Sequence, residues 1–173
     1  MTRLGAPLAQ GCPLVGRDVR VELTEAQILA AVQIGVRRHF RAKGAGWPDR
    51  VATHSGLLGD VVGAIGEFAL CLAVGVEWVD EGYTGATPDV AGAYLRTTNG
   101  DSPEILKGRH LLIRPPDPSG VYVLGLYGRR VVTFPGWIMS DAAILGGTQS
   151  PWWRGDAWWI PQTALGAFPW PTV

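Results

Sequence analysis

The stretch that most constrains the fold is residues 58–74, LGDVVGAIGEFALCLAV, which consists almost entirely of small and apolar residues. Asp60 is placed to cap a helix here and Gly75 to end it. A helix that is apolar on nearly every side is stable in water only when other elements cover it. The chain is therefore predicted to bury this helix, with its helices packed on a sheet.

Another helix is predicted just upstream, over residues 24–42. Thr24 and Gln27 have the spacing of a capping box, in which each residue bonds the backbone of the other. Apolar residues then recur at helical spacing until Gly44 and Gly46 end the pattern. The C-terminal end of this helix is basic, which complements the helix dipole and could equally meet phosphates.

Most of the remaining sequence predicts short strands. Apolar runs bounded by Gly, Pro and polar residues predict strands at 19–21, 77–80, 89–97, 109–114, 121–127, 130–134 and 158–160, and a short helix at 140–145. The PPDPSG stretch before residue 121 predicts a hairpin connection. This order favours an α+β or mixed α/β fold, with a central mixed sheet of about four to six strands flanked by helices.

Composition limits the classes of protein that fit. The 173 residues predict one globular domain, preceded by an arm over residues 1–22. Lysine plus arginine equals aspartate plus glutamate at 15 each, so any nucleic-acid contact must be local. The sequence has no export signal, and no apolar run approaches the ~20 residues of a membrane span. With Cys12 and Cys71 interpreted as free thiols, a cytoplasmic protein without membrane contact is expected.

The charges within apolar segments are the candidates for chemistry. Glu67 is the only charge between Val61 and Cys71, and a buried carboxylate needs an arginine, a metal or hydrogen-bond donors to offset its desolvation. Asp89 opens the strand DVAGAYLRTT, and Arg96 leaves that strand on the Tyr94 side. We expect Glu67, Asp89 and Arg96 to converge at one end of the contact between helix and sheet.

These residues resemble the PD-(D/E)XK nuclease superfamily, in which a helix glutamate, a Pro-Asp turn and a Glu/Gln-x-Lys strand surround a divalent cation. The matching pieces are GEFAL with Glu67, PDV with Asp89, and Tyr94-Leu95-Arg96 followed by Thr97-Thr98. The arrangement is most similar to small phage-type members, and it extends loosely over residues 24–165. The resemblance implies a restriction-endonuclease-like core and a metal-dependent nuclease acting on nucleic acid, most simply DNA, in the host cytoplasm.

The resemblance also implies roles for individual residues. It implies Mg²⁺ or Mn²⁺ held by Asp89 and Glu67, a catalytic set of Glu67, Asp89 and Arg96, and substrate contacts from Tyr94, Thr97, Thr98, Arg37 and Arg38. The chain departs from the family at two positions. Tyr94 stands where a carboxylate ligand is expected, and Arg96 replaces a lysine and stays protonated, so it cannot act as a base.

Other interpretations of the same residues stay open. Arg96 could simply neutralise Glu67 while Asp89 caps a turn, and the fold could be a catalytically inactive module that binds DNA or a protein, or a phage structural component. Residues 137–173 carry six tryptophans, which either pack in the core or contact a second copy of the chain, as in a homodimer, or a protein partner. The Trp152-Trp153 pair is the first candidate for such a contact. The spacing of the three histidines does not favour a zinc site.

Overall fold

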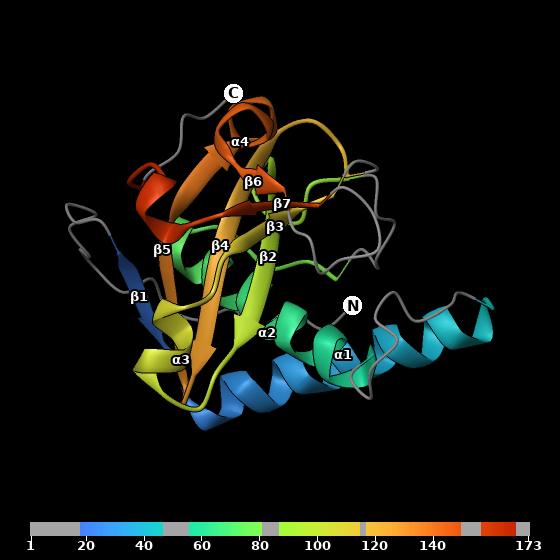
Figure 1. Ribbon diagram of the computed structural model, residues 1–173. Helices are drawn as coiled ribbons and strands as arrows, with labels where there is room; N and C mark the ends of the chain where they lie inside the picture. Colours follow the sequence, from blue (N-terminus) through green and yellow to red (C-terminus); the bar gives the residue numbers. More distant parts are fainter. Residues whose placement is uncertain (1–17, 47–55, 81–86, 115–116, 150–156, 169–173) are drawn as a thin grey trace.

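The computed structural model of the chain describes residues 18–46, 56–80, 87–114, 117–149 and 157–168 (Figure 1). The helices are α1 (Glu25–Gly44), α2 (Gly56–Val74), α3 (Pro103–Lys107) and α4 (Ser140–Gly146), with a 3₁₀ turn at Gln162–Ala164. The strands are β1 (Val19–Glu22), β2 (Ala93–Asn99), β3 (Leu111–Ile113), β4 (Val121–Gly128), β5 (Val131–Met139), β6 (Thr148–Gln149) and β7 (Trp158–Ile160). The fold is mixed α+β, as predicted.

The strands form two sheets. The first has the order β1-β5-β4-β2, in which β2 and β4 run parallel and the other neighbours run antiparallel. The second has the order β3-β7-β6 and is antiparallel. The mixed central sheet was predicted from the sequence, but the second sheet was not.

Helices α1 and α2 cover one face of the first sheet, and the second sheet covers the other (Figure 1). Leu95 of β2 and Val123 of β4 pack on the helix side with Ile65 of α2. Tyr122 and Leu124 of β4 pack on the opposite side in a separate cluster. Strands β2 and β4 are thus buried on both faces, which explains why β4 is apolar throughout instead of alternating.

Glycines allow α2 to approach its neighbours closely. A side-chain carbon on Gly35 of α1 would lie 2.5 Å from the Val61 Cα atom, so α1 and α2 meet backbone to backbone. One on Gly66 would collide with the side chain of Thr97 in β2, with 2.8 Å between the new carbon and the Thr97 Cβ atom. Position 66 therefore fixes how near α2 lies to the sheet, and Glu67 follows it directly.

Several local predictions are confirmed. The Thr24 side chain accepts from the Gln27 backbone N–H at the start of α1, while the Gln27 side chain accepts from the Thr24 N–H, as a capping box requires. The short strand at the N-terminal end, helix α4 and strand β7 lie where they were expected. Cys71 is a buried free thiol, whereas Cys12 lies outside the described residues.

Other predictions are wrong. Residues 77–80 form no strand. The PPDPSG stretch does not join a hairpin, because β3 pairs with β7 and β4 pairs with β2 and β5. Asp60 does not cap α2, since the helix begins at Gly56 and the Asp60 carboxylate pairs with His39 at 3.0 Å.

The expectation that no apolar segment reaches the length of a membrane span is also wrong. Among the described residues, α2 is long and apolar enough by composition to cross a bilayer. Its buried residues, among them Ile65, Phe68 and Leu70, pack in the same cluster as residues of α1 and of the first sheet. The covering elements that were predicted for this helix are therefore present.

Candidate functional site

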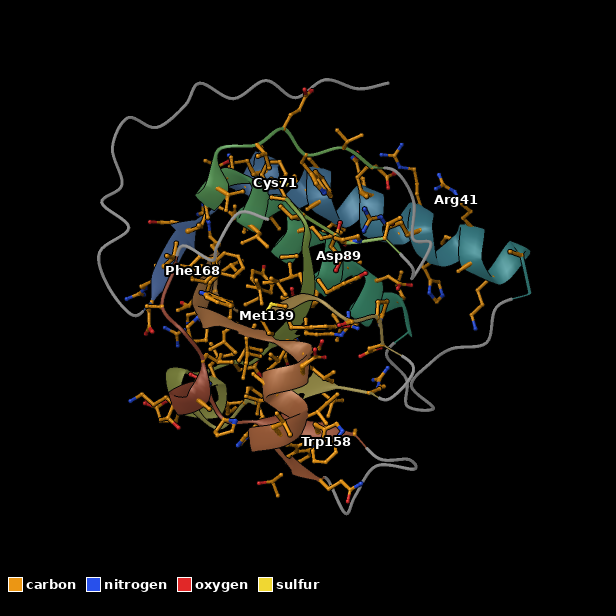
Figure 2. All side chains as sticks on the ribbon, turned by 90° about the horizontal axis from the view of Figure 1, so that it is seen from above. Arg41, Cys71, Asp89, Met139, Trp158 and Phe168 are labelled. Carbon is orange, nitrogen blue, oxygen red and sulfur yellow. The ribbon has the colours of Figure 1, made fainter. Side chains whose placement is uncertain are left out.

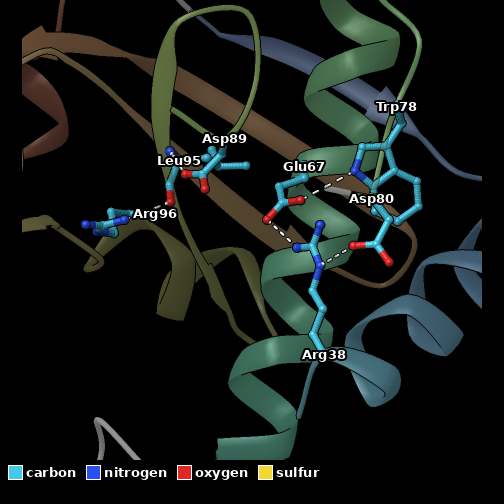
Figure 3. Close-up of polar contacts among 7 residues, drawn as sticks. All are labelled: Arg38, Glu67, Trp78, Asp80, Asp89, Leu95 and Arg96. Carbon is cyan, nitrogen blue, oxygen red and sulfur yellow. Dashed lines mark hydrogen bonds and ion pairs between the residues drawn. The ribbon is translucent and has the colours of Figure 1, made fainter. Parts of the chain in front are cut away.

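Glu67 projects from α2 into a hydrogen-bonded cluster with Arg38 of α1 (Figure 3). Its Oε1 atom lies 2.7 Å from Arg38 Nη1, and its Oε2 atom accepts a longer bond of 3.4 Å from the indole of Trp78. Arg38 Nε donates in turn to Asp80 Oδ1 at 3.0 Å. The Arg38 and Glu67 side chains are only 11% and 12% exposed, so this is a largely desolvated ion pair.

The partner of Glu67 was misassigned from the sequence. Arg96 was considered as the cation that neutralises Glu67, and Arg38 was assigned to substrate contact or to the helix dipole. Burial tends to lower the pKa of Arg38, but hydrogen bonds and charges from Glu67 and Asp80 raise it above its ordinary value. Arg38 is therefore a fixed positive charge inside the fold instead of a surface contact.

Asp89 is held at the entrance to β2. Its Oδ2 atom accepts the backbone N–H of Leu95 at 2.7 Å, across a tight turn in which Ala91 and Gly92 adopt positive φ angles of 47° and 80°. Among the described residues, no hydrogen bond reaches its Oδ1 atom. Asp89 thus stabilises a turn, as the structural interpretation supposed, and its Oδ1 atom is not used in that turn.

The electrostatic surroundings of Asp89 link it to both neighbouring charges. Burial raises its pKa above the ordinary value, against the opposing effect of the Leu95 N–H bond. The negative charge of Glu67 raises the pKa further, whereas Arg96 and Arg38 lower it. The Glu67 carboxylate, expected to share a metal ion with Asp89, therefore lies close enough for its charge to act on Asp89.

Arg96 lies on the other face of β2, away from Glu67 (Figure 3). Its Nη2 atom pairs with Asp117 Oδ2 at 3.0 Å, and its guanidinium carbon lies 5.3 Å from the centre of the Tyr122 ring. The charges of Asp117 and Asp89 raise the pKa of Arg96, although burial, the largest effect, acts to lower it. The predicted convergence is therefore wrong for Glu67 and Arg96, because Glu67 pairs with Arg38 and Arg96 pairs with Asp117 on the other side of β2.

Tyr94 shares the Arg96 side of β2 and is buried. Its ring stacks on Tyr122 with 5.1 Å between ring centres, and the Tyr122 hydroxyl donates to the Pro118 carbonyl at 2.7 Å. Residue 120 must be glycine here, because it has a φ angle of 153° and a side-chain carbon would lie 3.0 Å from the Tyr94 ring. Tyr94 is a packing residue in this structure, and its role in substrate contact stays a prediction.

The remaining predicted substrate residues are dispersed. The Thr97 hydroxyl is buried without a hydrogen-bond partner in the described part of the chain and lies against Gly66 of α2. Thr98 is half-buried on the opposite face of β2. Arg37 is exposed on α1 and donates to the Gln33 carbonyl. Figure 2 shows Asp89 near the middle of the molecule and Arg41 towards the far end of α1.

Asp89 and Glu67 are the carboxylates that the predicted Mg²⁺ or Mn²⁺ ion would use. Within the described ranges, no group of three or more His, Cys, Asp or Glu side chains is arranged to hold a metal ion. Magnesium can bind through one or two carboxylates while keeping several waters, and Asp89 with Glu67 supplies that minimum. Arg38 works against metal binding at Glu67, because its guanidinium already pairs with the Glu67 carboxylate.

Sequence reasoning missed the partners of the charged residues. Trp78 and Asp80 were assigned to a strand, and Asp117 was interpreted only as part of a turn. The sequence signal that could have identified Asp117 was Arg96, a cation on an apolar strand that needs an acidic partner. Trp152, Trp153 and Trp170 lie outside the described residues.

Comparison with family models, with curated proteins and with solved structures gives no match.

Proposed function

We propose that this chain is a nuclease-derived protein that binds one Mg²⁺ or Mn²⁺ ion through Asp89 and Glu67 and cleaves phosphodiester bonds of DNA slowly. The observation that carries the proposal is the Oδ1 atom of Asp89, which accepts no hydrogen bond among the described residues and belongs to a carboxylate within electrostatic reach of Glu67. The restriction-endonuclease-like core implied by the sequence resemblance belongs to this proposal, and so does action in the cytoplasm.

The roles follow from the chemistry of each group. A bound divalent cation would polarise the phosphate and lower the pKa of an attacking water. Asp89 would be the principal ligand, because its second oxygen carries no competing hydrogen bond among the described residues. Arg96 stays protonated, so it contributes positive charge towards a phosphate and no proton acceptance.

The same geometry makes the reaction slow. Tyr94 is stacked on Tyr122 on the side of β2 away from Glu67, so position 94 supplies no ligand and two carboxylates are left for the cation. No lysine occupies the position of Arg96, so the chain provides no general base there. Arg38 reduces the negative charge available at Glu67.

A second candidate function is favoured by the Arg38 pair itself. A Glu67 that is permanently neutralised by Arg38 would leave a catalytically inactive fold that binds DNA or a protein partner. The two functions differ in whether Asp89 binds metal.

Calorimetric titration with Mn²⁺, paired with cleavage of plasmid and single-stranded DNA, separates the two. Wild type is compared with Asp89→Asn, which keeps an acceptor for the Leu95 N–H, and with Asp101→Asn as an exposed control. The nuclease proposal expects Mn²⁺ binding and cleavage that both disappear in Asp89→Asn and persist in Asp101→Asn. DNA binding without metal binding or cleavage in wild type would establish the inactive module instead.

A further inference from the structure

The Arg38 side chain joins two acidic groups that lie far apart in the sequence. One guanidinium donates to Glu67 Oε1 from Nη1 at 2.7 Å and to Asp80 Oδ1 from Nε at 3.0 Å. The Arg38 and Asp80 side chains are 11% and 18% exposed, so little water screens the contact. A positive charge is thus built into the protein at the meeting point of α1, α2 and the segment after α2.

Both oxygens of Glu67 are engaged by donors in this arrangement. Oε1 accepts from Arg38, and Oε2 accepts from the Trp78 indole. A divalent cation that binds Glu67 must displace at least one of these donors, and it must also approach the guanidinium charge in a poorly hydrated environment, where like charges repel strongly. The field of Arg38 reaches Asp89 as well.

We infer that the Arg38 guanidinium occupies the cation position beside Glu67 and thereby sets the metal affinity of the site. The inference rests on the proposed metal role of Glu67 and Asp89 and adds a positioning residue to it. Arg38 holds the Glu67 carboxylate in place when no metal is bound and competes with the metal for it. The chain is therefore a weak metal binder because of one residue on α1.

The test is Mn²⁺ titration of Arg38→Gln, followed by calorimetry, with wild type and Arg37→Gln as comparisons. Glutamine keeps a neutral donor for Glu67, and Arg37 is the adjacent but exposed arginine, which donates to the Gln33 carbonyl of its own helix. Arg38→Gln should bind Mn²⁺ about tenfold or more tightly than wild type, since a nearby positive charge is gone. Arg37→Gln should match wild type.

Free guanidinium gives a second readout that does not depend on cleavage. At millimolar concentration it should weaken Mn²⁺ binding to Arg38→Gln by refilling the vacated position, and it should leave Arg37→Gln unchanged. A variant that is folded, as judged by circular dichroism, but binds Mn²⁺ no more tightly than wild type overturns the inference.

Loss of folding in Arg38→Gln is also informative. Ligand that binds only the native state stabilises it by mass action, so Mn²⁺ should restore the folded signal of a destabilised variant. A variant that stays unfolded at every Mn²⁺ concentration overturns the inference. Failure of the proposed function is a different result, in which wild type neither binds Mn²⁺ nor cleaves DNA. The inference about Arg38 is judged separately, by the change in Mn²⁺ affinity of Arg38→Gln.

Discussion

Replacing Gly66 with alanine tests whether close approach of α2 to β2 positions the site. The added carbon would lie 2.8 Å from Thr97 Cβ and 2.9 Å from Thr97 Cγ2, both too short for carbon atoms in van der Waals contact. Overpacking of this kind costs about 1–3 kcal/mol. Alanine recovers up to about 1 kcal/mol through its higher helix propensity. With the full recovery of about 1 kcal/mol, the expected net loss is up to about 2 kcal/mol.

Urea unfolding followed by circular dichroism measures this loss, and Gly63→Ala is the matched control. Gly63 lies in the same helix, but no atom lies within 4 Å of the position its side-chain carbon would take. That control should gain about 0.5–1 kcal/mol from propensity alone. For a chain of this size, the Gly66→Ala loss corresponds to a melting temperature lowered by about 2–4 °C per kcal/mol.

A second substitution identifies the colliding group. Thr97→Ala removes the hydroxyl and the Cγ2 methyl, but it leaves Cβ, so it should relieve only part of the loss when combined with Gly66→Ala. The free-energy changes of the two substitutions should then fail to add, as they do for residues in contact. If Gly66→Ala is as stable as Gly63→Ala, or if the two changes simply add, the reasoning about close approach is refuted.

Three further predictions concern buried groups. Because burial raises the Asp89 pKa in the folded state, the wild-type free energy of unfolding should fall as pH rises from about 4 through the folded pKa. Asp89→Asn should flatten this pH dependence in urea unfolding, and equal pH dependence in the two proteins would refute the prediction. Burial raises the Cys71 pKa to about 12, so a Cys12→Ser protein should react with a thiol reagent only on unfolding, and fast native reaction would contradict this. Tyr94→Glu buries a carboxylate beside Tyr122 and should cost about 2–4 kcal/mol in urea unfolding without tightening Mn²⁺ binding; tighter binding would make position 94 a ligand site.

The helices could be predicted from the sequence because their signals are local. The Thr24–Gln27 capping box and the apolar run through α2 each lie within one element, so composition and spacing suffice. Boundaries were less accurate: α2 begins at Gly56 instead of near residue 58. Strand pairing could not be predicted in the same way. Strand β3 pairs with β7, far along the chain, and the intervening prolines gave a misleading turn signal.

The charges of the candidate site show the same limit. The sequence identified Glu67 and Asp89 as carboxylates in apolar segments, and the structure brings them within electrostatic reach of each other. The sequence could not show which arginine pairs with Glu67, because Arg38 lies 29 residues upstream and is one of several basic residues at the end of α1. The sequence also could not show that Arg96 points to the side of β2 away from Glu67, since that depends on which face of the sheet α2 covers.

The order of elements along the chain has a consequence for how the protein is made. Helix α2 leaves the ribosome before β2, β4 and β5, the strands that cover it, have been synthesised. Strand β1 likewise waits for β5, its antiparallel partner, before it can join the sheet. Contacts between such distant segments form slowly, so a nascent chain exposes an apolar helix of membrane-span length during translation. Its yield in cells should depend on chaperones that shield this helix until β5 has emerged.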